Sequence, residues 1–108
     1  MLARTRTRKA TRAAFPRQVL LCRGREALAL DARDISVGGV FVKDGGALQP
    51  RTLLTLRVAL PGLKAFTVMG RVTHQVNGAV PGAGVEFVGL LPTQRRQLES
   101  YVAHAPAV

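Results

Sequence analysis

The sequence has few of the residues on which several classes of protein depend. Its single cysteine, Cys22, excludes an internal disulfide and any metal site built from several cysteines, and it suits a reducing compartment. Tryptophan is absent, and only four phenylalanines and one tyrosine supply aromatic rings. No apolar run approaches the roughly 18 residues of a membrane-spanning helix. We therefore expect a cytoplasmic protein with no membrane partner.

The usual motifs of catalysis are also missing. The sequence contains no G-x-S-x-G, no H-E-x-x-H, no P-loop and no paired carboxylates, and neither His74 nor His104 has an obvious catalytic or metal-binding neighbour. We expect no catalytic residue, no metal and no enzyme activity. The protein is then expected to work by binding.

Acidic residues are scarce, and the basic ones are unevenly placed. Six Asp and Glu stand against sixteen Lys and Arg, which gives a net charge of +10. The first seventeen residues contain no acid and hold six of the cations: Arg4, Arg6, Arg8, Lys9, Arg12 and Arg17. Their low apolar content predicts a basic arm over residues 1–17, mobile through residue 14 until an anion orders it, and a folded domain over 18–108.

Beyond the arm, apolar and polar residues alternate with the period of a β-strand. In "LLTLRVAL" the apolar set that shares one face is Leu54, Leu56, Val58 and Leu60. Pro61 and Gly62 then turn the chain into "KAFTVMGRVTH", which predicts a hairpin. The segments "QVLLC", "ALALDARD", "VFVK" and "AGVEFV" predict four more strands, and "PTQRRQLESYVAHA" predicts a helix. The predicted fold is all-β: a six-stranded antiparallel β-barrel with a short C-terminal α-helix.

The stretch "DISVGG" connects the second and third predicted strands, at a rim of the barrel within reach of the arm. The Asp34 carboxylate accepts hydrogen bonds, Ser36 donates or accepts them, and Gly39 lets the backbone approach a ligand or adopts a positive φ without strain. Taken alone, such a stretch is usually only a turn. An acid beside arginines, however, suits a ligand with both phosphates and base N–H donors, and guanine nucleotides have both.

Two motifs together carry a family resemblance. Arg8 and Arg12 form R-x-x-x-R, and Asp34, Ser36 and Gly39 form D-x-S-x-x-G. In this order they resemble the PilZ domain, a family of bacterial receptors for the second messenger cyclic di-GMP. The resemblance covers almost the whole chain, and "DISVGGVFV" and "GAGVEFVGLLPTQRRQLESYV" are similar to stand-alone members of the family.

The resemblance implies cyclic di-GMP as the ligand and gives each motif a role. Arg8 and Arg12 would bind phosphates and guanine edges, while Asp34, Ser36 and Gly39 would enclose a guanine. Five further residues are candidate secondary contacts: Arg4, Thr7, Lys9, Gly38 and His74.

Three points stay open at this stage. His74 stands where some relatives have a base-contacting tryptophan, but a lone histidine there is more often only an exposed residue at a strand end. In the family, the residue just before R-x-x-x-R influences whether one ligand or a stacked pair binds. Here that residue is Thr7 rather than an arginine, which favours one bound ligand. Arg4 and Arg8 repeat the motif's spacing, so the working pair is either Arg4 with Arg8 or Arg8 with Arg12.

The expected function is signal transduction, by a receptor that passes the cyclic di-GMP level to an unidentified effector protein. One alternative is a PilZ-like adaptor that binds protein partners without nucleotide. The other is a small basic barrel that binds nucleic acid, as its net charge permits. Single-strand binders stack bases on exposed aromatic rings, whereas Phe66 and Phe87 occupy inward strand positions, which disfavours nucleic acid.

Overall fold

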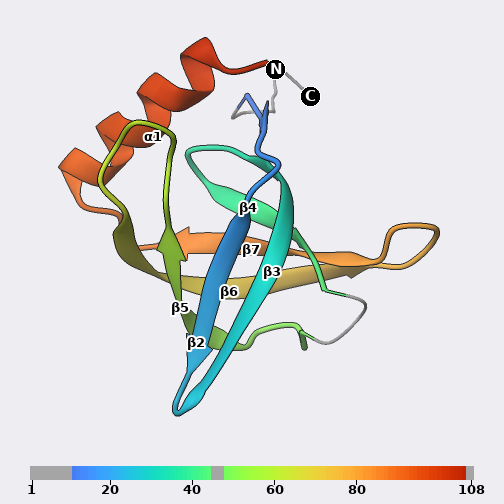
Figure 1. The fold of residues 1–108 in the computed structure, drawn as a ribbon. Coiled ribbons are helices and arrows are strands. Elements are labelled where there is room, and N and C mark those ends of the chain that lie inside the picture. The colour runs from blue at the N-terminus through green and yellow to red at the C-terminus, as the bar shows by residue number, and fades with distance from the viewer. Residues whose placement is uncertain (1–10, 45–47, 107–108) are drawn as a thin grey trace, which may run out of the picture.

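The computed structural model describes residues 11–44 and 48–106, which form a β-barrel with one helix at its end (Figure 1). The strands are β1 (Ala13–Ala14), β2 (Gln18–Arg23), β3 (Glu26–Ile35), β4 (Gly39–Lys43), β5 (Leu53–Val58), β6 (Phe66–Val76) and β7 (Gly82–Val88). The helix α1 spans Pro92–His104. Among the residues that the structure describes, no helix is long and apolar enough to cross a lipid bilayer.

The strands form one antiparallel sheet that closes on itself. Their order is β1-β3-β2-β5-β6-β7-β4, and the pairing of β3 with β4 joins the two sides. The predicted six-stranded antiparallel barrel with a C-terminal helix is confirmed as β2 to β7 and α1, and β1 is one extra short strand. Closure pairs the edges that an open sheet would leave exposed.

The core follows the alternation seen in the sequence. The apolar residues predicted to face inward on and just after β5, Leu54, Leu56, Val58 and Leu60, are all buried. On β6 and β7 the buried set includes Val68, Val72, Val85 and Phe87. The turn between β5 and β6 uses Gly62 at a φ of 74°, a conformation that glycine adopts without strain. The predicted hairpin around Pro61 and Gly62 is confirmed.

The helix is held to the barrel by tertiary contacts. Leu98 is fully buried, and the ring of Tyr101 meets that of Phe15 edge to face at 5.6 Å between centroids. The Tyr101 hydroxyl donates to the Ala14 carbonyl oxygen at 2.7 Å. Leu91 caps the helix without a side-chain acceptor, but its own N–H donates to Gln94 Oε1 at 3.0 Å. In Figure 1, α1 lies at the end of the barrel where the chain enters it.

The C-terminal part of the expected arm belongs to the barrel. Ala13 and Ala14 pair with Ile35 and Asp34 of β3, and Phe15 is fully buried. Ala13 and Ala14, the last two residues of the segment expected to be mobile, are therefore paired in the sheet. Residues 1–10 lie outside the described part, and whether arm and barrel act as separate units divided at residue 17 stays a prediction. The pairing of β1 with β3 has one consequence for function: it fixes residue 12 beside Asp34.

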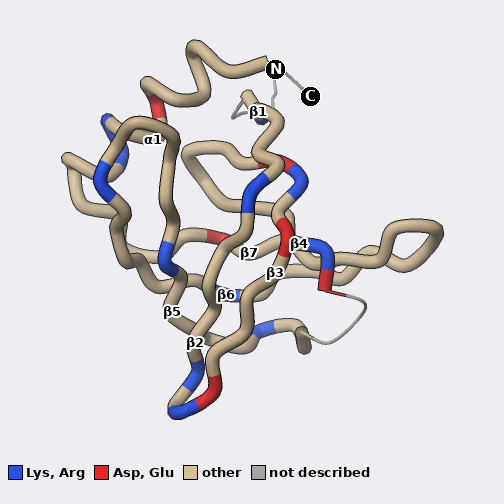
Figure 2. Tube along the Cα trace, in the orientation of Figure 1, with Lys and Arg blue, Asp and Glu red and all other residues tan. Residues whose placement is uncertain are grey.

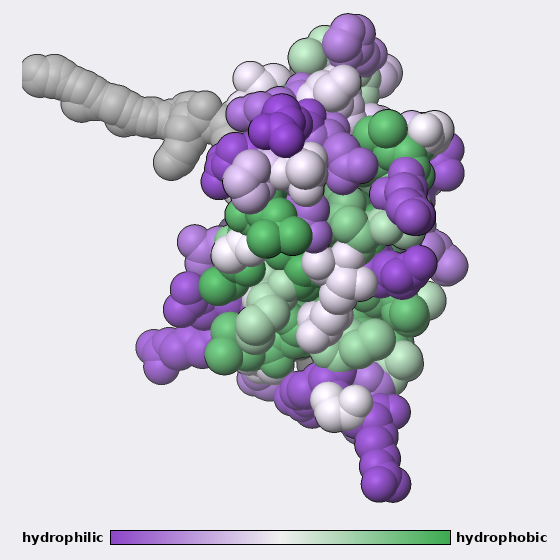
Figure 3. Space-filling model, turned by 90° about the vertical axis from the view of Figure 1, so that its left-hand side faces the viewer, coloured by the Kyte–Doolittle hydropathy of each residue, from purple (hydrophilic) through white to green (hydrophobic). Residues whose placement is uncertain are grey.

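Basic residues are not confined to one end of the described chain. Figure 2 shows them at the tip of the β2–β3 hairpin, on α1 and along β3, with acidic residues interspersed. The face in Figure 3 has an apolar area between its hydrophilic upper and lower parts. Electrostatics alone therefore does not single out one binding face, and the site has to be identified from its geometry.

Candidate ligand-binding site at the barrel rim

A pocket of about 780 Å³ lies where the β3–β4 connection meets β6 and β7. Its walls include six of the ten predicted ligand-binding residues, namely Arg12, Asp34, Ser36, Gly38, Gly39 and His74. The other four, Arg4, Thr7, Arg8 and Lys9, lie outside the described residues. The volume falls in the range of small-molecule sites, about 300 to 1,000 Å³.

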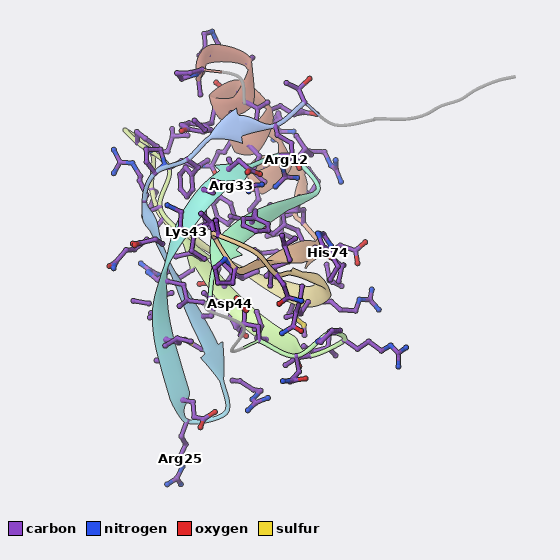
Figure 4. All side chains as sticks on the ribbon, turned by 90° about the vertical axis from the view of Figure 1, so that its right-hand side faces the viewer. Arg12, Arg25, Arg33, Lys43, Asp44 and His74 are labelled. Carbon is purple, nitrogen blue, oxygen red and sulfur yellow. The ribbon has the colours of Figure 1, made fainter. Side chains whose placement is uncertain are left out.

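Asp34 is the buried charge at the centre of this pocket. Its side chain is 1 % exposed, and each carboxylate oxygen accepts a hydrogen bond from an arginine. Oδ1 accepts from Nε of Arg12, and Oδ2 accepts from Nε of Arg33 at 2.6 Å. Figure 4 shows both arginines close together at this end of the barrel. A carboxylate removed from water needs such partners, because an unpaired buried charge is strongly destabilising.

Arg12 also reaches the other polar residue of the motif. Its Nη1 donates to Ser36 Oγ at 3.3 Å, and its Nη2 lies 3.5 Å from the backbone oxygen of Asp34. The structure therefore brings Arg12 into contact with two other predicted site residues, Asp34 and Ser36. Arg12 joins the R-x-x-x-R motif to the D-x-S-x-x-G motif.

Ser36 shapes the turn as well as lining the pocket. Its backbone N–H donates to the Gly39 oxygen at 2.8 Å, and its Oγ accepts from the Gly38 N–H at 3.1 Å. The Gly38 oxygen in turn accepts from the N–H of Phe87 at 2.8 Å, which attaches the turn to β7. The stretch "DISVGG" is therefore both a turn and part of the pocket wall.

Gly39 has a packing role that its sequence context did not reveal. The positive φ considered for it is wrong, because its backbone does not adopt one. Instead, a Cβ at Gly39 would fall 2.3 Å from the carbonyl oxygen of Val85. The missing side chain lets β4 pair closely with β7, where Gly39 lies opposite Glu86. Gly38 is different: a Cβ there would meet only Ser36 Oγ, at 3.7 Å.

His74 of β6 also lines the pocket, and Figure 4 shows it apart from Arg12 and Arg33. The register between β6 and β7 shifts between Val72 and His74, so that Thr73 and His74 are both exposed. The histidine ring lies over Gly84 of β7, where an added Cβ would fall 2.5 Å from its Cε1. Its Nδ1 is 3.0 Å from Thr73 Oγ1. The irregularity in β6 therefore places a ring in the pocket wall, and its part in ligand contact stays a prediction.

Arg33 is a pocket residue that sequence reasoning missed. It lines the cavity, binds Asp34, and places its guanidinium carbon 4.0 Å from the centroid of the Phe41 ring. It lies outside both motifs, so no pattern pointed to it. The available signal was its position immediately before the acid at the end of a predicted strand.

The pocket offers hydrogen-bond donors and acceptors rather than metal ligands. Within residues 11–44 and 48–106, no group of three or more His, Cys, Asp or Glu side chains is arranged to hold a metal ion. The chemistry available here is recognition of an anion by guanidinium groups, combined with acceptance of N–H donors by one carboxylate.

Comparison with known families gives the same assignment as the two motifs. The model of the PilZ domain matches residues 6–104. The chain belongs to the PilZ domain family. A comparison with curated protein sequences found no match.

Solved structures with the same fold include several PilZ proteins. The inhibitor of motility MotI/DgrA of Bacillus subtilis superposes with a TM-score of 0.79 at 20 % identity, over 94 % of this chain and 52 % of that one. YcgR of Escherichia coli, solved in complex with c-di-GMP, gives 0.74 at 20 % identity, over 89 % and 44 %. PlzA of Borreliella burgdorferi, also in complex with c-di-GMP, gives 0.67 at 12 % identity, over 89 % and 41 %. This PilZ domain thus spans about half the length of these proteins, and at such identities the likeness concerns the fold.

The two glycines of the turn provide a test of the site's framework. Gly39→Ala should lower the free energy of unfolding by ~1 to 3 kcal/mol, because its Cβ would overlap a backbone oxygen of β7 that cannot easily move. Gly38→Ala is the matched control and should change stability by less than ~0.5 kcal/mol. Urea denaturation measures both. Equal stability of the two variants would show that β4 and β7 do not need this close approach.

Proposed function

We propose that this PilZ domain is a receptor for cyclic di-GMP, which it binds in the rim pocket, and that it passes the second-messenger level to an effector protein. The observation that carries the proposal is the contact of Arg12 with both Asp34 and Ser36, which unites the two motifs at one cavity. The family membership supports it, as do structural neighbours that were solved with c-di-GMP.

The pocket's chemistry fits both the phosphate and the guanine of this ligand. A guanidinium fork donates to phosphate oxygens or to the O6/N7 edge of guanine. The Asp34 carboxylate accepts hydrogen bonds, and guanine can donate them from its amino group and its ring N–H. An acid alone would repel a phosphodiester, but Arg12 and Arg33 surround this one. The combination selects a nucleotide with both an anionic linkage and N–H donors.

Binding in this pocket is an exchange of hydrogen bonds. Oδ1 of Asp34 accepts from Arg12, and the Asp34 side chain is only 1 % exposed, so in this proposal a guanine N–H reaches the oxygen by taking the place of the arginine. The side chain of Arg12 is 41 % exposed and has room to turn, whereas the side chain of Asp34 is buried and stays in place. Arg12 then becomes available to the phosphate or to the guanine edge. In this proposal the Asp34 carboxylate is an acceptor that keeps its position, and the Arg12 side chain moves.

The arm supplies the remaining contacts to the ligand and the surface that the effector protein recognises. Arg8 precedes Arg12 by one R-x-x-x-R spacing, and Arg12 itself lines the pocket next to β1. We place Arg8 on the ligand's phosphate or second guanine, with Arg4, Thr7 and Lys9 as outer contacts. In this proposal the ligand orders the arm across the rim, and the effector protein reads the ordered arm.

We assign the domain no catalytic step and no metal or other cofactor, because the pocket's residues serve recognition of the ligand. Its location is proposed as cytoplasmic, since its only cysteine is unpaired and a reducing compartment suits such a chain. Thr7 before R-x-x-x-R favours one bound ligand over a stacked pair.

Asp34→Ala separates this proposal from plain electrostatic attraction. A charge-assisted hydrogen bond contributes ~1.5 to 3 kcal/mol, so the variant should bind cyclic di-GMP at least about tenfold more weakly. Because the substitution also raises the net positive charge, binding of a DNA oligomer should stay the same or strengthen. Calorimetry with both ligands at physiological salt measures this.

The matched control is Glu26→Ala, which removes an acid at the exposed β2–β3 hairpin away from the pocket. Thermal unfolding of each variant checks that the barrel is intact. Parent-like affinity of Asp34→Ala for cyclic di-GMP would show that the carboxylate does not read guanine. A parent protein that binds DNA but no cyclic di-GMP would replace the proposal with a nucleic-acid function.

Ordering of the arm is tested by hydrogen exchange of the full chain. Amides of residues 1–10 should exchange more slowly with saturating cyclic di-GMP than without it, because the arm becomes part of the binding site. Amides at the tip of the β2–β3 hairpin, where Figure 4 shows Arg25 far from the pocket, serve as the internal reference. Identical exchange of the arm in both samples would rule out ligand-induced ordering as the output.

A further inference from the structure

The Arg33 side chain is held in one orientation from two directions. Its Nε donates to Asp34 Oδ2 at 2.6 Å, and its guanidinium carbon lies 4.0 Å from the centroid of the Phe41 ring. Phe41 is itself 4 % exposed, and it pairs with Asp34 in the β3–β4 register. A buried ring and a buried carboxylate therefore fix the plane of the guanidinium. Such a group loses little conformational entropy when it binds.

The outer nitrogens of Arg33 can bind a further partner. A guanidinium has five N–H donors, and the bond to Asp34 uses one. Within the described part of the chain, Arg33 donates to no acceptor other than Asp34. Its side chain is 50 % exposed and lines the rim pocket. Two nitrogens with four N–H groups are thus presented at a cavity in a fixed plane.

The charge around the pocket favours an anion at these donors. Arg12 and Arg33 share the single carboxylate of Asp34, which leaves the cluster with a net charge of +1. The other acid on the pocket wall, Glu86, lies 3.5 Å from the guanidinium of Arg71. A planar fork that is already oriented matches the geometry of phosphate oxygens.

We propose that Arg33 is a third arginine of the binding site, whose Nη groups donate to a phosphate oxygen of the ligand. This rests on the proposed function, since the phosphodiester is that of cyclic di-GMP. Arg33 differs from Arg12 because it lies on β3 within the barrel. It keeps its hydrogen bond to Asp34 Oδ2 while a guanine N–H binds Oδ1. The site then combines one rigid cation with the movable Arg12.

The first experiment compares the loss of Arg33 with the loss of an equal charge elsewhere. Arg33→Gln should weaken binding of cyclic di-GMP about tenfold or more, as loss of a charge-assisted contact does. Arg25→Gln removes the same charge at the hairpin tip, which Figure 4 shows far from the pocket, and should change affinity by less than about twofold. Equal affinities of the two variants would overturn the proposal.

The conservative variant tests the need for a planar fork. Arg33→Lys keeps the charge but neither stacks flat on Phe41 nor donates two parallel bonds, so its affinity should stay close to that of Arg33→Gln. Recovery of parent affinity by Arg33→Lys would overturn the proposal in favour of charge alone. Thermal unfolding of both variants shows whether the barrel is intact, and Arg33→Lys remains informative if Arg33→Gln does not fold.

A double substitution separates contact with the ligand from support of Asp34. In the Asp34→Ala background, Arg33→Gln should still weaken binding several-fold, because Phe41 continues to orient the guanidinium toward the ligand. No additional loss in that background would mean that Arg33 acts only by holding Asp34, and would overturn the contact. These results require a parent that binds cyclic di-GMP. A parent that does not bind it overturns the proposed function itself, and a binding parent with an unchanged Arg33→Gln overturns only the assignment of Arg33.

Discussion

One carboxylate organises the functional end of this barrel. Asp34 is fully buried, and its charge is compatible with that position only because Arg12 and Arg33 each donate to one of its oxygens. The same pair of bonds orients both arginines at the pocket. Burial makes the carboxylate a rigid acceptor, and the two arginines make the surrounding wall attractive to anions. The proposed recognition of a base and a phosphate in one pocket rests on this single constraint.

Several contacts of the barrel bring the partners of Asp34 into place. The short β1 strand pairs with the end of β3 and so delivers Arg12 to Asp34. On the other side, the absent side chain of Gly39 lets β4 lie close against β7, which brings the turn of the D-x-S-x-x-G motif against the strand that bears Glu86. The helix closes the same end through Tyr101, whose hydroxyl binds the backbone of β1. Fold and site therefore share their contacts at the rim.

Strand alternation and two motifs were enough to predict the barrel and its terminal helix, and they placed the Asp34 turn within reach of the arm that carries Arg12. Three features escaped the sequence for physical reasons. The packing role of Gly39 depends on which strand becomes its neighbour, which local pattern does not encode. The place of His74 depends on a register shift within β6, and such irregularities have no fixed signature. The orientation of Arg33 depends on its cross-strand contact with Phe41 as well as on its bond to Asp34, and local pattern does not encode the cross-strand neighbour.

The central claim is that a guanine takes the place of Arg12 at the buried carboxylate. A crystal structure of the chain with cyclic di-GMP tests it most directly. We expect a guanine N–H donor at about 2.7 to 3.2 Å from Asp34 Oδ1, with the Arg12 guanidinium turned onto the nucleotide. A complex in which Arg12 still binds both Asp34 and Ser36, with the nucleotide elsewhere on the surface, would contradict the account.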